Sequence, residues 1–410
     1  MDQVIEVLGC WEGFSACNPR RLEPDATRKH AEVWIELIPD RGHKRHCSAC
    51  GHQVYVVHDY HKRHIRDLPI LDAQTHLHVH LSRVECSHCG GPKLEHVEWL
   101  SPYSRITKRF AEAVARLCQV LPVKHVAEHF CLGWHTVKAI DKAYLQETLE
   151  PLDLSDVTVL CMDEFAIHKG HRYATVVMDP LRKRVLWVGN GRSRKDVAKF
   201  FELLGVDGCK RIKAVVMDMS TSFELEVRKH CPAAEVVFDL FHVVAKYGRE
   251  VIDRVRVDEA NRLREDKPAR KVVKSARWLL LRNAENVTKA KDQVKLRELL
   301  KANKALMAVY ILKDELKQLW ACRNSEVAIA RWLQWHRKAM YSGIKTLEVF
   351  AKRLLPYLQG IIAHSRWPLH TSLIEGVNNR IKVIKRMGYG FRDEEYFFLK
   401  IRAAYPGITR

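Results

Sequence analysis

The sequence VLCMDEFAIHKGHRYATVVMDP, residues 159–180, contains two apolar runs joined by a short polar connection, and this pattern indicates the fold of the surrounding domain. Each run has the length and composition of a buried strand, and each ends in an acidic residue, with Asp163 and Asp179 as the strand-end aspartates. The connection AIHKGH is too short for the crossover that parallel strands need, so the two strands are predicted to be antiparallel. Asp179 is therefore expected at the opposite edge of the sheet from Asp163.

Alternating helices and strands follow this hairpin. Further strands are predicted at residues 184–190, 212–218 and 234–239, and helices at residues 193–205 and 220–231. Two hairpin-linked strands followed by this alternation predict a mixed α/β sheet.

Aspartates also end the fourth and fifth strands, at Asp218 and Asp239. Both strands follow helices and can run parallel to the first, so these aspartates are expected at the same carboxyl edge as Asp163, where open α/β sheets bind ligands. Glu164 should point to the other face of the sheet, because side chains alternate along a strand. The alternative for each aspartate is a structural role as a cap or turn residue.

Two carboxylates on one edge, in a basic protein, suit Mg²⁺ in phosphoryl chemistry, because Mg²⁺ prefers hard oxygen ligands and completes its shell with phosphates and water. A second metal usually calls for another carboxylate, and the candidate is Glu375. Its predicted helix has an apolar stripe formed by Ile374, Val377, Ile381 and Ile384. The face that holds Glu375 also carries candidate DNA-binding donors, at Asn378, Asn379, Lys382 and Arg386.

The composition favours a polyanionic partner. The chain has 410 residues, 47% of them hydrophobic, and a formal net charge of +20, with basic clusters RHIR, KRIK and RIKVIKR in regions that look structured. The alternative is that the excess charge only aids solubility. No stretch approaches the roughly 20 apolar residues needed to cross a bilayer, and the N-terminal residues do not resemble a signal peptide. We therefore expect a cytoplasmic, nucleoid-associated protein without a membrane partner.

Four of the twelve cysteines form two tight pairs, and the spacing of each pair is that of a zinc knuckle: Cys47 with Cys50, and Cys86 with Cys89. Glycine directly follows the second cysteine of each pair, as knuckle turns often require. The pairs therefore predict one structural Zn²⁺ with four thiolate ligands. The alternatives are a redox pair, two unrelated CxxC sequences, or histidine ligands at His43, His46, His52 or His88.

Residues 101–150 predict three helices with tight turns, punctuated by Pro122 and Gly133. Helix, short turn and helix around residues 122–149 fit a helix-turn-helix whose second helix enters the major groove of DNA. The DNA-reading residues would then be His135, Thr136 and Lys138. Any three-helix connector gives a similar pattern, so the zinc module beside it and the positive charge are needed to favour DNA binding.

Taken together, MDEFAIHKGHRYATVVMD, VVMDMSTSF, VVFDLFHVV and EGVNNRIKVIKRMGYGF, behind the double CxxC and the helix-turn-helix, resemble the transposases of the ISL3 family of bacterial insertion sequences. The resemblance covers nearly the whole chain in the same order. It implies a DDE transposase in which the catalytic acids are Asp163, Asp218 and Glu375. Asp239 and His242 resemble an accessory motif, although Leu240 stands where the family commonly has arginine.

The resemblance also implies a domain order with an RNase H-like core. We expect a zinc-binding module over residues 1–100, a helix-turn-helix over 101–150, the first part of the core over 151–245, a helical insertion over 246–360 and the last part of the core, with the acidic helix, over 361–410. The fold class is thus multidomain α/β, with a mixed-sheet core interrupted by an all-α insertion.

The implied activity is Mg²⁺-dependent cleavage and strand transfer of double-stranded DNA, with two catalytic Mg²⁺ ions or Mn²⁺ in their place. The partners would be the terminal inverted repeats of the insertion sequence, the target DNA, and further copies of the chain in a homodimer or larger synaptic complex. The alternatives are a catalytically inactive, sequence-specific DNA-binding regulator, and an RNase H-like nuclease or resolvase without strand transfer.

Overall fold

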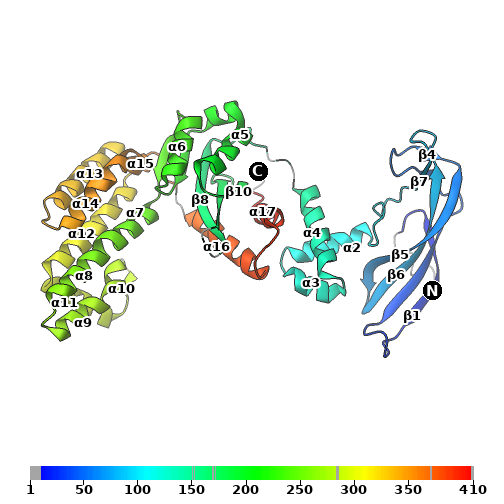
Figure 1. The fold of residues 1–410 in the computed structure, drawn as a ribbon, viewed down its shortest axis with the longest axis horizontal. Coiled ribbons are helices and arrows are strands. Elements are labelled where there is room, and N and C mark those ends of the chain that lie inside the picture. Colours follow the sequence, from blue (N-terminus) through cyan, green and yellow to red (C-terminus); the bar gives the residue numbers. More distant parts are fainter. Residues whose placement is uncertain are drawn as a thin grey trace. The chain divides into compact units, whose positions relative to one another are not determined.

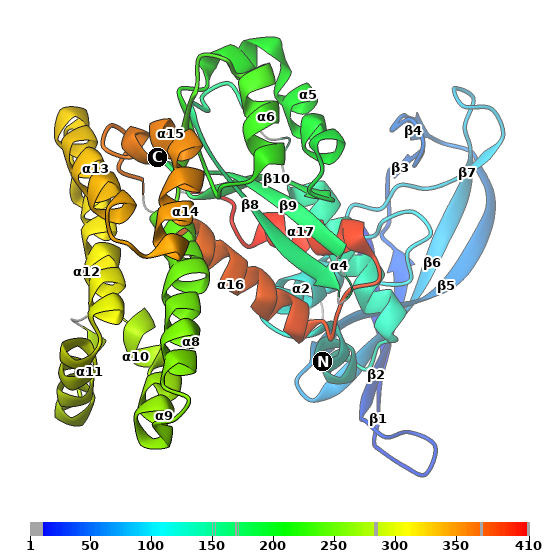
Figure 2. The ribbon, with the colours of Figure 1, turned by 60° about the vertical axis from the view of Figure 1, so that its left-hand side comes forward.

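The computed structural model describes residues 11–149, 151, 153–168, 170, 172–282, 286–369 and 372–407, and it divides into two compact units. The first unit comprises Met1–Glu150 together with Arg386–Lys400, and the second comprises Pro151–Lys385 with Ile401–Arg410. Figures 1 and 2 show the elements of both units in ribbon form. Among the described residues, no helix is long and apolar enough to span a bilayer.

The first unit begins with a sheet of strand order β1-β2-β6-β5, on which β7 pairs with β6. Its strands are β1 Phe14–Leu22, β2 Glu32–Pro39, β5 Val57–Ile70, β6 Ala73–Glu85 and β7 Pro92–Leu94, and a separate hairpin joins β3 Arg45–His46 to β4 Gln53–Val54. Alternating positions Leu77, Val79 and Leu81 of β6 point into one apolar core, as the period of a half-buried strand requires. β2 pairs with β6 in parallel, whereas β5 pairs with β6 antiparallel.

Three helices follow, α2 Lys108–Cys118, α3 Val123–Phe130 and α4 Trp134–Thr148, as the sequence predicted. Their own apolar core contains Phe110, Val126 and Val137. The side chain of Thr107 caps the first of them by accepting a hydrogen bond from the backbone N–H of Phe110. The turn between α3 and α4 contains Cys131 in the left-handed region, at φ 51°.

A segment from the far end of the chain belongs to this helical group. Residues 386–400 contain most of α17, Glu394–Ala403. The fully buried carboxylate of Asp141 on α4 accepts hydrogen bonds from the Tyr396 hydroxyl and, at 2.7 Å, from the Lys400 ammonium. The sequence-based division assigned these residues to the catalytic core, and the structure instead groups them with the helix-turn-helix.

The second unit contains a five-stranded mixed sheet of order β10-β9-β8-β11-β12. Its strands are β8 Val159–His168, β9 Arg172–Asp179, β10 Arg184–Asn190, β11 Ala214–Met217 and β12 Glu235–Phe238. β8 and β9 are antiparallel, whereas β11 is parallel to both β8 and β12. The observed topology confirms the predicted RNase H-like mixed sheet.

Helices cover the sheet on two sides. α5 Arg194–Arg211 and α6 Thr221–His230 share an apolar core with Leu160, Met162 and Met217 of the strands. The sequence predicted that the first of these helices ends near Gly205, but α5 continues to Arg211 across a kink at this glycine, whose φ is 71°. α16 Ser372–Met387 lies beside β8, where the Lys385 ammonium donates to the carbonyl oxygen of Ala166 at 3.1 Å.

The helical insertion follows β12 and returns to it. It contains α7 Leu240–Tyr247, η1 Gly248–Ile252, α8 Asp253–Arg262, α9 Lys267–Ser275, α10 Arg277–Leu281, α11 Ala290–Ala302, α12 Lys304–Gln318, η3 Leu319–Ala321, α13 Ser325–Met340, α14 Lys345–Leu354, η4 Leu355–Tyr357 and α15 Leu358–Ala363. α15 approaches β12 so closely that a Cβ at Gly360 would lie 2.4 Å from the Phe238 ring. This contact fixes the base of the insertion on the sheet.

Candidate active site and metal centre

The four cysteines of the two knuckles lie together in the first unit. Their sulfur atoms are all within 4.8 Å of one another, and the Cys47–Cys89 and Cys50–Cys86 sulfur pairs are 3.9 and 3.6 Å apart. A tetrahedral Zn²⁺ with Zn–S bonds of about 2.3 Å requires sulfur separations of about 3.8 Å. The donor set and its spacing therefore fit a structural zinc ion.

Local turns build this site. Gly51 and Gly90 adopt positive φ angles of 73° and 69°, and their N–H groups donate to the carbonyl oxygens of Cys47 and Cys86 at 2.9 Å each. This conformation favours glycine, which explains why glycine follows each cysteine pair. Of the alternative histidine ligands, His43 lies 3.0 Å from a carboxylate oxygen of Glu95, and the rings of His52 and His88 stack on each other.

Three aspartates line up across the second unit's sheet. Val216 of β11 pairs with Cys161 of β8, so the same register continued by two residues places Asp218 opposite Asp163. Met217 pairs with Phe238, which likewise places Asp239 beside Asp218. Since neighbouring strands are about 4.8 Å apart, the three carboxylates form one acidic row.

The position of Asp163 differs from the prediction in one respect. The sequence placed it at the end of its strand, but β8 continues to His168 because pairing with β9 extends to the His168–Arg172 pair. Asp163 is therefore in the middle of β8, next to the point where the shorter β11 ends. Asp179 does end β9, where its carboxylate accepts hydrogen bonds from the N–H groups of Leu181 and Arg182, a turn-forming role.

Burial makes the acidic row costly to ionise. It raises the pKa of Asp163 to about 6, with repulsion from Asp218 adding to the shift while the N–H of Glu164 and His242 oppose it. Burial also raises the pKa of Asp218. The charges of Glu164 and Asp239 raise this pKa further, whereas His242 lowers it. One carboxylate oxygen of Asp218 is buried without a hydrogen-bond partner among the described residues. An unpaired buried oxygen in a carboxylate cluster fits a place for a hard divalent cation.

α16 contributes to the same row. The Asn378 amide donates to a carboxylate oxygen of Asp163 at 2.5 Å, across 215 residues of sequence. Glu375 is exposed in the first turn of α16, and residues three apart on a helix are neighbours, about 5–6 Å between Cβ atoms. Glu375 thus lies next to the side chain that contacts Asp163, while Ile374, Val377, Ile381 and Ile384 form the predicted buried stripe.

The other candidates on α16 lie away from Asp163. Asn379, Lys382 and Arg386 are exposed, and the Lys382 ammonium donates to the Asn379 side chain at 3.2 Å. These three residues lie on the polar face, and their contact with DNA stays a prediction. The amide of Asn378, in contrast, already donates a hydrogen bond to Asp163.

Residues flanking the row also come together. A carboxylate oxygen of Asp239 lies 3.8 Å from Nε2 of His242, and both residues influence the pKa of Asp218. Glu164 forms an ion pair with Arg192 at 2.6 Å, and its charge also acts on Asp218. The side chain of Leu240, at which the chain departs from the family pattern, lies outside the described residues.

The predicted DNA-reading residues of α4 divide into two groups. His135 and Thr136 are exposed, whereas the Lys138 ammonium lies 2.9 Å from a carboxylate oxygen of Asp393. Burial alone would raise the pKa of Asp393, but the N–H of Tyr396 and the ammonium groups of Lys138 and Lys142 hold it at about 2.

The acidic segment at residues 393–395 was missed at the sequence level. Glu395 also pairs with Lys142, at 2.7 Å. The signal available was the pair of acids in the first turn of α17, which is a common capping feature and does not indicate a partner helix.

Comparisons with known proteins agree with this arrangement. Family models match a transposase domain of the ISL3 type over residues 160–401, the helix-turn-helix domain of transposase family ISL3 over 95–145, and a zinc finger of the transposases of IS204, IS1001, IS1096 and IS1165 over 43–89.

Two relatives are similar over most of their length. The transposase for insertion sequence element IS1001 from Bordetella parapertussis is 51% identical over 409 residues, covering 100% of this chain and 99% of the relative. The transposase for element IS1557 from Mycobacterium tuberculosis is 26% identical, covering 91% and 88%. The matched domains follow the order of the zinc tetrad, the helix-turn-helix and the acidic row, and the chain belongs to the ISL3 family of transposases.

Proposed function

We propose that this transposase binds the terminal inverted repeats of its insertion sequence and cleaves and transfers DNA strands with Asp163, Asp218 and Glu375 as metal ligands. The observation that carries the proposal is the acidic row, in which the raised pKa of Asp163 and a buried Asp218 oxygen without a hydrogen-bond partner among the described residues suit a divalent cation. Two Mg²⁺ ions bound there, or Mn²⁺ in their place, would polarise the phosphodiester and neutralise charge on the attacking and leaving oxygens.

The residues of the chain prepare this site. Asp163 and Asp218 present oxygens from adjacent strands, and the amide of Asn378 orients one oxygen of Asp163. Glu375 sits on a helix whose buried stripe anchors it beside the sheet. Asp239 and His242 are accessory candidates, because their charges bear on Asp218.

DNA recognition is assigned to the first unit. The helix-turn-helix would read base edges through His135 and Thr136, while Lys138 would first have to leave Asp393. Lysine and arginine would supply the salt-dependent attraction to the DNA backbone. Since two ends are joined in one reaction, we further propose a homodimer or larger synaptic complex, acting on the bacterial nucleoid in the cytoplasm.

Strand transfer from end oligonucleotides into a plasmid tests the proposal. We expect Asp163→Asn to abolish Mg²⁺-dependent cleavage and joining, because a ligand is lost, while binding of the end DNA is unchanged. Asp207→Asn is the matched control, since it makes the same chemical change at an exposed carboxylate of α5 that pairs with Lys210, and it should keep activity. Appreciable nicking by Asp163→Asn would overturn the ligand assignment.

The same assay separates the two alternatives. A DNA-binding regulator would bind ends but would not cleave even as the wild-type chain. A nuclease or resolvase would cut the end oligonucleotide but would never join its 3′-hydroxyl to the plasmid.

A further inference from the structure

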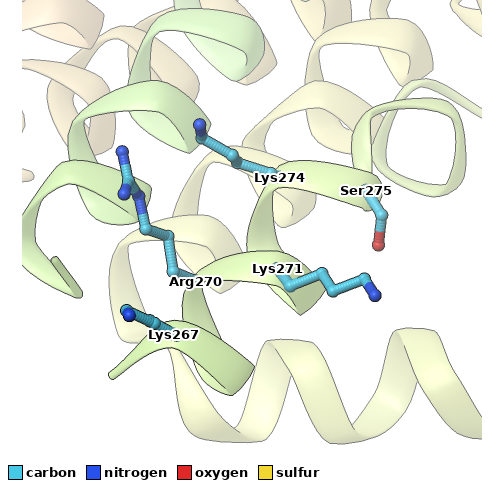
Figure 3. A pocket seen from close by; sticks show the side chains of 5 residues that line it. All are labelled: Lys267, Arg270, Lys271, Lys274 and Ser275. Atoms are coloured by element: carbon cyan, nitrogen blue, oxygen red, sulfur yellow. The ribbon is translucent and has the colours of Figure 1, made fainter. Parts of the chain in front are cut away.

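A basic face on α9 has no role in the site described above. Lys267, Arg270, Lys271 and Lys274 occur within two turns at spacings of three and four residues, so they share one side of the helix. With Ser275 they line a hollow of about 430 Å³ (Figure 3). The Lys295 ammonium of α11 adds a fifth cation at its border, 3.4 Å from the Ser275 hydroxyl.

These cations differ from those on neighbouring helices. On α8 and α10, Arg256 and Arg277 both pair with Asp253, and Arg262 pairs with Glu259. Within the described part of the chain, none of the four α9 cations has a carboxylate within 4.0 Å, and Nε of Arg270 is buried without a hydrogen-bond partner. Like charges at these spacings destabilise a helix, so the face gains from a polyanion.

The position of α9 indicates which part of a DNA duplex it could reach. α7, η1 and α8 form one helical run over residues 240–262 that starts directly after Asp239. At about 1.5 Å per residue this run is about 35 Å long. In both ribbon views α9 lies at the end of the insertion away from the five-stranded sheet (Figures 1 and 2). With about 3.4 Å per base pair, that length corresponds to about ten base pairs.

We propose that the α9 face binds the phosphate backbone of duplex DNA about ten base pairs from the reacting phosphate. The proposal that the α9 face binds DNA requires only that the chain binds DNA. The separation of about ten base pairs also rests on the proposed active site. Lysine and arginine on one helix face, without an acidic residue among them, suit a uniform line of phosphates and provide no base-specific reading. The helical insertion is thereby a second DNA-binding surface, separate from the helix-turn-helix.

The test compares two triple variants of the full chain. Lys267→Gln/Lys271→Gln/Lys274→Gln removes three cations from α9, and Lys345→Gln/Lys352→Gln/Arg353→Gln removes three from α14 as the matched control. Glutamine retains helix propensity, and circular dichroism verifies the fold. Fluorescence anisotropy with a 40-base-pair duplex measures affinity between 50 and 200 mM salt.

Log affinity falls with log salt concentration by about 0.9 for each phosphate contact. Because the α9 variant lacks three cations, we expect the magnitude of its slope to be smaller than that of the wild-type chain by about 2.7. The wild-type chain should then lose about 40-fold more affinity than the variant across this salt range. The control should keep nearly the wild-type slope. An unchanged slope in the α9 variant, or an equal decrease of the slope in the control, would overturn the proposal. Binding of polyglutamate is measured in the same way. A variant that loses polyglutamate binding but keeps DNA binding would also overturn the proposal, because that result indicates an acidic protein partner.

Cleavage assays distinguish this proposal from the proposed function. The α9 variant should cleave end duplexes with 5 flanking base pairs like the wild-type chain, and should be impaired on duplexes with 30 flanking base pairs on the side that reaches α9. Equal impairment on both substrates contradicts the assigned distance. Salt-dependent binding through α9 in a chain that never cleaves would refute the catalytic proposal and leave the α9 surface standing.

Discussion

The zinc tetrad and the acidic row, for which we propose Mg²⁺ binding, differ in how their side chains are organised. Among the described residues, the four cysteines form the only group of His, Cys, Asp or Glu side chains close enough to hold an ion without rearrangement. The acids instead combine the buried Asp163 and the half-buried Asp218 with the exposed Glu375. A structural zinc site is closed and preformed, whereas a phosphoryl-transfer site must leave room for substrate oxygens.

The two sites are therefore expected to contribute differently to the stability of the fold. Each zinc knuckle forms within four residues, and the ion joins two such turns, so zinc binding is coupled to folding. The acidic row stands on a sheet that has its own apolar core, so that core can hold the fold without Mg²⁺. Three experiments test these different roles of the two sites.

The largest effect is expected from Cys86→Ser. Loss of one thiolate should remove zinc and unfold the knuckles, because structural zinc in finger peptides contributes about 10–16 kcal/mol. Zinc content and protease sensitivity of residues 43–96 measure the result. The matched control is Cys131→Ser, which changes a cysteine outside the tetrad and should keep zinc. Removal of Mg²⁺ from the wild-type chain should leave all protease-resistant fragments unchanged. Retention of full zinc by Cys86→Ser would contradict the four-thiolate site.

An intermediate effect is expected from Asn378→Ala. Its amide orients Asp163, and loss of a partner that holds a metal ligand typically costs about 10- to 100-fold in metal affinity or activity. The apparent Mg²⁺ requirement for cleavage should therefore rise, with recovery at high Mg²⁺. Asn379→Ala, one residue on and exposed, is the control and should keep the wild-type Mg²⁺ requirement. Identical Mg²⁺ curves for the two variants would remove Asn378 from the site.

The smallest effect is the pH dependence of stability without Mg²⁺. Because burial raises the pKa of Asp163 from 3.8 to about 6, the folded state binds more protons than the unfolded state between these values. This contribution is fully present below pH 3.8 and is lost as pH rises through 6. The free energy of unfolding should fall by about 1 kcal/mol between pH 5 and 7, with zinc retained. Urea denaturation gives the free energy of unfolding of the wild-type chain and of Asp163→Asn at each pH, and the difference between them measures the contribution of Asp163. An increase of this difference with pH would contradict the expected direction.

Much of the two sites could be predicted from local patterns. Spacing and a following glycine identified the zinc ligands, and the short connection after β8 fixed an antiparallel hairpin that separated Asp179 from Asp163. Helical periodicity correctly gave the buried stripe of α16. Each of these features depends on residues within about one or two turns of each other, where sequence directly limits geometry.

Other features needed contacts between distant residues. Lys138 looked like a DNA-reading residue, and nothing near it in sequence reveals Asp393 as its partner. Asn378 looked like a solvent-facing donor, yet it lies at the border of the polar face and reaches Asp163. Residues 386–400 follow the acidic helix directly but complete the apolar and polar packing of α4 through Tyr396.

Side-chain chemistry and short-range periodicity were sufficient to predict the zinc ligands, the order of strands and helices, and the candidate acids. Long-range contacts were needed to show that Asp163 lies within its strand, that Asp218 and Asp239 align with it, and that α17 packs on α4. These outcomes depend on strand register and helix packing. Several strand and helix pairings fit the local sequence equally well, and the simultaneous burial of many apolar groups selects one of them.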